Sequence, residues 1–281
     1  MATLLEQTLS FKENKLLSKA LKVQAKAFGI LDIPFLLQIL DNHPINKVLD
    51  IGTGEGSFIL EIAKRKPEID FVAMDHNKEL IKQATEAKEK LNIKNINFIK
   101  HRFGSRFYSK KFDLVFTRFC LEHSSSPQTF VNQVFNQLNK RGVFAIIEEY
   151  WFDTGLDDEI WQKFRKNNLK TFKMKFRVDP YTPRHLTKWL HEAGFKNIKS
   201  KIAIYSPNTI GIEYFCSLIL NIAFLGNQWF PDIWKKKYLK KLEQWIEKVI
   251  YGHELDPFIT CVHATAIKKE HSFSKGLEEV L

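Results

Sequence analysis

A glycine-rich turn at residues 48–56 constrains the fold of this chain more than any other feature. The stretch Val48–Ile51 is apolar except for Asp50, and Gly52, Gly54 and Gly56 follow before a helical pattern begins. Glycine has no Cβ and tolerates positive φ, so the backbone of such a turn can approach a nucleotide-like ligand. The free N–H groups of the next helix suit a carboxylate or phosphate. A plain strand–helix turn is the alternative interpretation.

The spacing of the glycines distinguishes between classes of ligand. A dinucleotide fingerprint is G-x-G-x-x-G, whereas here the third glycine is Gly56 and Ser57 follows it. Asp50, two residues before the first glycine, would repel a pyrophosphate. A carboxylate at this position suits a ligand that carries an ammonium group. The pattern therefore disfavours an NAD-dependent dehydrogenase.

Strands and helices are predicted to alternate over residues 45–150. A second apolar run, 71–75, ends in Asp75 about 20 residues after the glycines, where doubly wound folds place the carboxylate that binds ribose hydroxyls. The alternative role for Asp75 is to cap the helix that opens at 77–80. Further strands are expected at 96–99, 112–116, 143–147, 202–205 and 259–264. Because these runs are nearly all apolar, we expect a parallel sheet with helices on both faces.

Several segments, in a fixed order, resemble the class I S-adenosylmethionine-dependent methyltransferases over about residues 15–270. They are LKVQAKAF (21–28), VLDIGTGEG (48–56), the strand end at Asp75, FDLVFTRFCLEH (112–123), LNKRGVFAIIEE (138–149) and DPYTPRHLTKWLHEAGFKNIK (179–199). The first of these is similar to a leading helix of the ubiquinone-biosynthesis-like branch. The resemblance implies an α/β Rossmann-like fold with a doubly wound, seven-stranded, mostly parallel sheet and a helical lid. It also implies S-adenosyl-L-methionine as the cofactor.

The resemblance further implies which residues bind the cofactor. They are Gln24, Asp50, Gly52, Thr53, Gly54, Asp75, His76, Arg102, Phe103, Thr117 and Arg118. The glycine turn is expected beside the methionine moiety, Asp75 on the ribose, and Thr117 and Arg118 near the methionine amino group through their backbone carbonyls. Arg102 departs from the family, which usually has an acid there to accept a hydrogen bond from the adenine amino group. A guanidinium has no acceptor, so either the amino group binds a backbone carbonyl or water, or Arg102 stacks on the purine instead. We expect cofactor affinity to fall by about 1 kcal/mol.

Two side chains near the carboxyl ends of strands, His123 and Glu149, are the candidate catalytic residues. Methyl transfer from a sulfonium is an in-line displacement, so the protein mainly aligns the acceptor and excludes water. A general base is needed only where the acceptor loses a proton. A structural role is the more frequent one for a lone histidine such as His123. Glu148 and Glu149 close the fifth strand, and alternation directs one toward the ligand and the other into packing.

The charge of the chain bears on the acceptor. The net charge is +11, with lysine-rich clusters at 163–177 and 235–241. The second cluster is the polar face of an amphipathic helix, so solvated faces are favoured over a nucleic-acid groove. Residues 117–120 also lack the Asn/Asp-Pro-Pro-Tyr signature of enzymes that methylate base amines. Aromatic residues crowd 152–176 and 214–230, so we expect an apolar or aromatic small-molecule acceptor, methylated on O, N or C.

Other functions stay open at this stage: an RNA or protein methyltransferase, and a non-catalytic binding protein of the same fold. A homodimer is also left open. Three scattered cysteines, Cys120, Cys216 and Cys261, indicate neither a disulfide framework nor a metal cluster. No signal-peptide pattern is present at the start, and the longest apolar run, 214–225, is too short to span a bilayer. We therefore expect a cytoplasmic protein without a transmembrane segment.

The expected organisation of the chain is one catalytic domain with a discontinuous lid. N-terminal helices are predicted over 1–44 and the cofactor-binding core over 45–150. A helical insertion (151–178), a core helix with the sixth strand (179–207), a lid insertion (208–256), a last strand (257–270) and a tail (271–281) follow. Additions at these places form a helical cap over the substrate in the family that the chain resembles.

Overall fold

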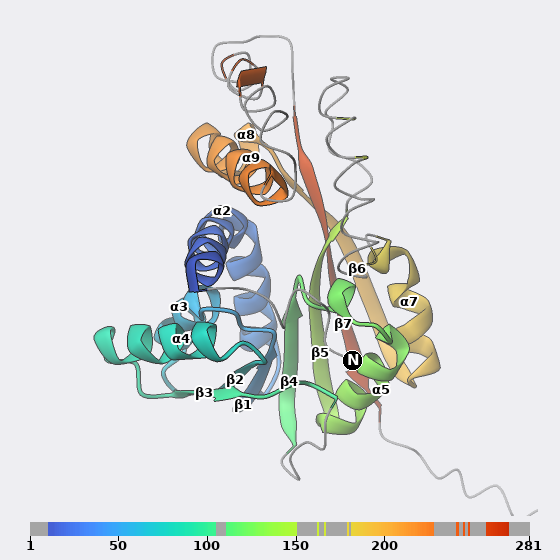
Figure 1. Cartoon of the computed structure of the whole chain (residues 1–281). Helices are drawn as coiled ribbons and strands as arrows, with labels where there is room; N and C mark the ends of the chain where they lie inside the picture. Colours follow the sequence, from blue (N-terminus) through green and yellow to red (C-terminus); the bar gives the residue numbers. More distant parts are fainter. Residues whose placement is uncertain are drawn as a thin grey trace, which may run out of the picture.

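The structure, a computed structural model, contains one seven-stranded sheet. It describes residues 11–104, 111–150, 181–227 and 257–269, together with 162, 166, 179, 240, 241, 244 and 247. The strands are β1 (Lys47–Ile51), β2 (Asp70–Asp75), β3 (Ile96–Lys100), β4 (Phe112–Arg118), β5 (Leu138–Tyr150), β6 (Phe195–Tyr205) and β7 (Ile259–Lys268). Their order across the sheet is β3-β2-β1-β4-β5-β7-β6 (Figure 1).

The sheet is mostly parallel, and this confirms the predicted fold class. Strands β1 to β5 run parallel to one another, while β7 is antiparallel to both β5 and β6. From β1 the chain proceeds outward through β2 and β3, and then returns to place β4 on the other side of β1. The order of the strands thus reverses between β1 and β4. Open α/β sheets bind their ligands at this point, outside the carboxyl ends of the strands.

Helices cover both faces of the sheet (Figure 1). One face packs against α2 (Phe11–Asn42), α3 (Ser57–Arg65), α4 (Lys78–Lys90), α8 (Pro207–Ile210) and α9 (Ile212–Asn227). The other face packs against α5 (Pro127–Gln137) and α7 (Thr182–Glu192). Alternate residues of each strand supply the two cores: Phe116 and Ala145 face α2, whereas Val115 and Phe144 face α5 and α7.

Helix α2 is a single long helix where the sequence indicated N-terminal helices, and it ends at Asn42 as expected. By length and composition alone, its stretch Leu17–Asn42 could cross a membrane, with a mean hydropathy of 1.4. The expectation of no transmembrane segment therefore holds apart from this one weak candidate. The criterion is weak, because 44% of the apolar window is buried in the fold and core helices meet it too. Phe28 and Leu36 of α2 are fully buried against the sheet.

The strands extend beyond their predicted limits, and for β5 this shapes the site. Arg118, the last residue of β4, pairs with Ile147, so Glu148, Glu149 and Tyr150 continue past the end of β4 and pair only with β7. The division of the chain into core, insertions and lid stays a prediction. Helices α8 and α9 fall in or beside the stretch predicted as lid. The tail, most of the insertion at 151–178 and most of the part of the lid insertion (208–256) that follows residue 227 lie outside the described residues.

Candidate cofactor and active site

The glycine turn after β1 needs its glycines for both conformation and space. Gly52 has φ of 81° and Gly56 has φ of 82°, in the left-handed region that side chains disfavour. A Cβ at Gly52 would lie 2.6 Å from the Cys120 sulfur, and one at Gly56 would lie 2.9 Å from the Phe98 ring. The amides of Gly52 and Thr53 both donate to the Met74 carbonyl at 2.9 Å. The turn is therefore tied to the end of β2.

Asp75 connects this turn to the end of β2. Its Oδ2 accepts a hydrogen bond from the Gly54 amide at 2.9 Å, and its Oδ1 accepts one from the Asn77 amide at 2.8 Å. The carboxylate is thereby fixed beside the glycines and is 8% exposed. The helix-capping role considered for Asp75 belongs instead to Asn77, whose side chain accepts from the amides of Glu79 and Leu80. Asp75 is free of that role and remains available for a ribose.

Asp50 lies on the same face of the sheet as Asp75, since alternate residues of β1 and β2 share a face. It is 4% exposed. Burial raises the pKa of its carboxyl to about 7, against the lowering effect of the nearby Arg118 guanidinium. A buried carboxyl with this pKa gains from a cationic ligand, because a cation favours its ionised form.

The turn after β4 is built around Glu148. Its Oε1 accepts hydrogen bonds from the amides of Cys120 at 3.1 Å and Leu121 at 2.8 Å. Phe119 has φ of 51°, which is uncommon for a bulky residue and marks a tightly constrained turn. The Thr117 hydroxyl donates to the Ile51 carbonyl at 3.2 Å and so joins the ends of β4 and β1. Glu148 is fully buried and shapes this turn.

Glu149 faces the opposite side of β5 from Glu148. It is partly buried and has no hydrogen bond or ion pair among the described residues. Burial, reinforced by Glu122 and then Glu148, raises the pKa of its carboxyl to about 8. His123 ends the short 3-10 helix Leu121–His123 and is 42% exposed in its side chain, with Nε2 3.6 Å from Glu122 Oε1. The catalytic roles of Glu149 and His123 stay predictions.

The other predicted cofactor residues lie around the same strand ends. The carbonyl of Gln24 on α2 accepts from Arg118 Nη2 at 3.2 Å, and His76 Nδ1 lies 3.3 Å from Asp75 Oδ1. Arg102 is exposed just after β3. The Phe103 ring packs on Phe130 of α5, with centroids 4.6 Å apart. The structure thus brings the predicted residues of α2, β1, β2 and β4 together, and it places Phe103 in the core on the α5 side.

Sequence reasoning missed a buried polar network beneath α2. Asp32, which is fully buried, pairs with Arg118 at 2.7 Å and also contacts Tyr205 and His263. An acid within the apolar run 30–40 of α2 was the signal that could have revealed it. The partners were hidden because they lie 86 to 231 residues away along the chain.

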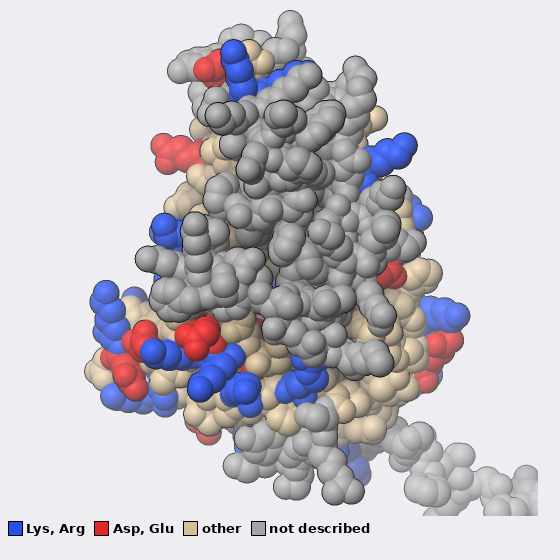
Figure 2. Space-filling view, in the orientation of Figure 1, with Lys and Arg blue, Asp and Glu red and all other residues tan. Residues whose placement is uncertain are grey.

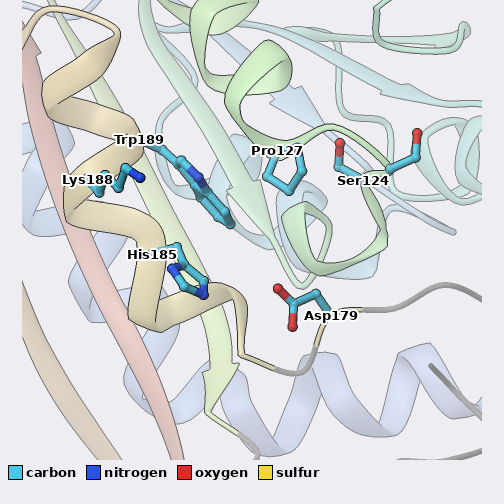
Figure 3. Close-up of a pocket in the computed structure, with 7 residues that line it drawn as sticks. Ser124, Pro127, Asp179, His185, Lys188 and Trp189 are labelled. Atoms are coloured by element: carbon cyan, nitrogen blue, oxygen red, sulfur yellow. The ribbon is translucent and has the colours of Figure 1, made fainter.

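A separate pocket of about 480 Å³ opens between the start of α5 and α7 (Figure 3). Its lining is Ser124, Ser125, Pro127, Asp179, His185, Lys188 and Trp189. Trp189 points from α7 toward Pro127 (Figure 3). This lining includes no predicted site residue, and the pocket lies on the face of the sheet opposite to Asp50 and Asp75.

Known proteins that are similar to this chain include several methyltransferases. A methyltransferase-domain family model matches residues 42–194, which is more than half of the chain. A carboxy-S-adenosyl-L-methionine synthase of Nautilia profundicola is 22% identical over 186 residues, covering 60% of this chain and 76% of that protein. A ribosomal RNA small subunit methyltransferase G of Legionella pneumophila is 38% identical over 73 residues, covering 26% of this chain and 35% of that protein.

A solved structure agrees in fold. The crystal structure of the plantazolicin methyltransferase, in complex with a triazolic desmethylPZN analog and SAH, is 18% identical in sequence. The match covers 92% of this chain and 91% of that one, with a TM-score of 0.55. The matched family segment contains the glycine turn, Asp75 and the turn after β4. The chain therefore belongs to the methyltransferase-domain family, within the class I S-adenosylmethionine-dependent methyltransferases.

Proposed function

We propose that this protein transfers a methyl group from S-adenosylmethionine to an apolar or aromatic small molecule. The observation that carries the proposal is the pair of carboxylates, Asp50 and Asp75, that flank the glycine turn on one face of the sheet. They lie where the strand order reverses, which is the ligand-binding point of such sheets. Asp50 suits the cofactor's ammonium group, and Asp75 suits its ribose hydroxyls.

The residues present fit this cofactor. The turn offers bare backbone, with positive φ at Gly52, Gly54 and Gly56. Asp75 is held by two backbone amides, so its carboxylate is preorganised for binding. The bound cofactor supplies a methyl group that is already activated by its positive sulfur. The protein's own part is to hold the two reactants in line and to exclude water.

Aromatic side chains support an apolar acceptor. Phe28 of α2 and Phe119 lie with ring centroids 4.9 Å apart beside the end of β4. Phe58, at the start of α3, lies 4.7 Å from the Arg118 guanidinium. Phe28 and Phe58 are buried in the core, whereas Phe119 is partly exposed, so one aromatic ring lies at the edge of the candidate site. The lid aromatics that the sequence pointed to lie mostly outside the described residues.

Glu149 is our candidate general base. Its carboxyl has no partner among the described residues, and its pKa of about 8 leaves it largely protonated at pH 7. For an acceptor that loses a proton, turnover should therefore rise with pH, with its midpoint at about pH 8, as Glu149 ionises. An acceptor that keeps its protons would show no such rise.

The test is transfer of tritiated methyl from S-adenosylmethionine into three fractions: deproteinised metabolite extract, total RNA and protein. We expect label in the metabolite fraction, its loss in Asp75→Ala, and retention in Asp70→Ala. Asp70 is an exposed residue at the opposite end of the same strand, which makes it a matched control. Label confined to RNA or protein would refute the small-molecule assignment. Cofactor binding without transfer to any fraction would favour a non-catalytic protein.

RNA methylation is the second candidate, because the net charge is +11 and several relatives are named as ribosomal RNA or tRNA methyltransferases. Against it, basic and acidic residues are interspersed over α3 and α4 on the face that Figure 2 shows. On α4, for example, Lys82 lies 4.0 Å from Glu86. RNA binding that falls steeply with salt, together with label in RNA, would establish this alternative.

A further inference from the structure

We propose that the Arg118 guanidinium binds a carboxylate at the methyl-transfer site and that buried Asp32 positions it. This inference rests on the proposed function and specifies a contact within the same site. In the pairing of β1 with β4, Ile51 lies opposite Thr117, so Arg118 is the next residue along and lies beside Gly52. Arg118 also shares the face of Phe116, which is the face of Asp50 and Asp75.

The guanidinium is held in one orientation. Its Nε donates to Asp32 Oδ2 at 2.7 Å, and its Nη2 donates to the Gln24 carbonyl at 3.2 Å. Its plane lies between aromatic rings, with Cζ 4.5 Å from the Phe119 centroid and 4.7 Å from that of Phe58. Arginine has five N–H donors. These two hydrogen bonds therefore leave the Nη1 edge without an acceptor among the described residues.

Asp32 is itself held in place by side chains of β6 and β7. Its Oδ1 accepts a hydrogen bond from the Tyr205 hydroxyl and lies 3.0 Å from His263 Nε2. Tyr205 and Asp32 are fully buried, and His263 is 2% exposed. The network thus joins α2, β4, β6 and β7 through one carboxylate. The two contacts to Oδ1 hold the carboxylate so that Oδ2 is directed at Arg118 Nε.

The remaining N–H donors of Arg118 determine which ligand can bind. Three N–H groups of Arg118 are left, two on Nη1 and one on Nη2, and neighbouring N–H groups on two guanidinium nitrogens bind a carboxylate in a bidentate geometry. Asp50 lies close enough for Arg118 to lower the pKa of its carboxyl. The site therefore offers an anionic and a cationic group together, which complements the ammonium and carboxylate of an amino acid. The carboxylate has two sources, the methionine part of the cofactor or an acid group of the acceptor.

The experiment measures binding by isothermal titration with two ligands. S-adenosylhomocysteine carries the carboxylate, while decarboxylated S-adenosylhomocysteine keeps the ammonium and lacks the carboxylate. We expect Arg118→Met to weaken the first at least tenfold and to leave the second unchanged, while Arg118→Lys recovers part of the loss. Arg65→Met on the exposed end of α3 is the control and should change neither.

The positioning role is tested by Asp32→Asn and Tyr205→Phe, which keep the shape of the buried side chains. Each should reduce the preference for the carboxylated ligand by a smaller factor than Arg118→Met. A loss of structure would instead weaken both ligands together. If Asp32→Asn fails to fold, the milder variant Tyr205→Phe still tests the positioning role.

A second arm tests the acceptor as the source. With S-adenosylhomocysteine bound, 4-hydroxybenzoate and its methyl ester are titrated as probes. If Arg118→Met loses binding of 4-hydroxybenzoate but not of its methyl ester, and its affinity for S-adenosylhomocysteine is unchanged, the carboxylate belongs to the acceptor. The inference is overturned if Arg118→Met weakens the binding of the carboxylated ligand and of its counterpart without the carboxylate equally in both experiments. It is also overturned if no affinity changes in either experiment. If the wild type binds neither nucleoside, the proposed function fails instead.

Discussion

Substitution of Asp50 by Asn should remove most of the pH dependence of cofactor binding. Asp50 is 4% exposed, and burial raises the pKa of its carboxyl to about 7. If this carboxylate receives the cofactor's ammonium group, only the ionised form binds at full strength. Protons and ligand then compete, so affinity falls as the pH drops below about 7.

The size of the effect follows from that pKa. A carboxyl with a pKa of about 7 is ionised to ~0.9 at pH 8 and to ~0.01 at pH 5. The expected loss of affinity between these pH values is about 90-fold, or ~2.7 kcal/mol. This is the upper limit, because the protonated carboxyl still accepts a hydrogen bond from an ammonium group.

The assay is isothermal titration with S-adenosylhomocysteine from pH 5 to pH 8 at constant ionic strength. Asp50→Asn should bind about tenfold more weakly at pH 8 and show a much flatter profile. As a control, 5′-methylthioadenosine lacks the ammonium group and should not follow the Asp50 titration. A flat profile in the wild type, or the same slope in Asp50→Asn, would refute the role of Asp50.

Four further outcomes are expected. Asp75→Ala should weaken cofactor binding at least tenfold, since the ribose hydroxyls lose their acceptor; unchanged affinity by titration would contradict this. Gly52→Ala should lower the free energy of unfolding in urea by about 2–5 kcal/mol, because the φ of 81° disfavours a side chain and the new Cβ would lie 2.6 Å from Cys120 Sγ. Adding Cys120→Gly should restore only the part of this loss that comes from the steric contact. Because the Glu149 pKa is raised from 4.5 to about 8, the native state holds its proton more tightly than the unfolded chain, and stability falls as pH rises between these values. Glu149→Gln should therefore raise the melting temperature more at pH 8 than at pH 5, and an equal shift would count against the raised pKa. His123→Ala should slow turnover without weakening cofactor binding; retained turnover would make His123 structural.

The sequence alone was sufficient for the fold class and for the glycine turn after β1, because both are encoded locally. Gly52 and Gly56 occupy left-handed conformations that few other residues adopt, so their spacing reports the backbone directly. The apolar runs 48–51 and 71–75 predicted two strands of a parallel sheet, and β1 and β2 pair in parallel. Strand limits were less well predicted, since β5 and β7 support each other beyond the apolar runs.

The tertiary structure alone decided which polar side chains meet. Asp32 is separated from Tyr205 by 173 residues and from His263 by 231, and only the packing of α2 on β6 and β7 brings them together. The same holds for Glu148, which the turn after β4 engages while Glu149 remains without a partner among the described residues. Local sequence patterns specify backbone conformation and which face of a strand is buried. Contacts between distant segments depend on how the elements pack, which no local pattern records.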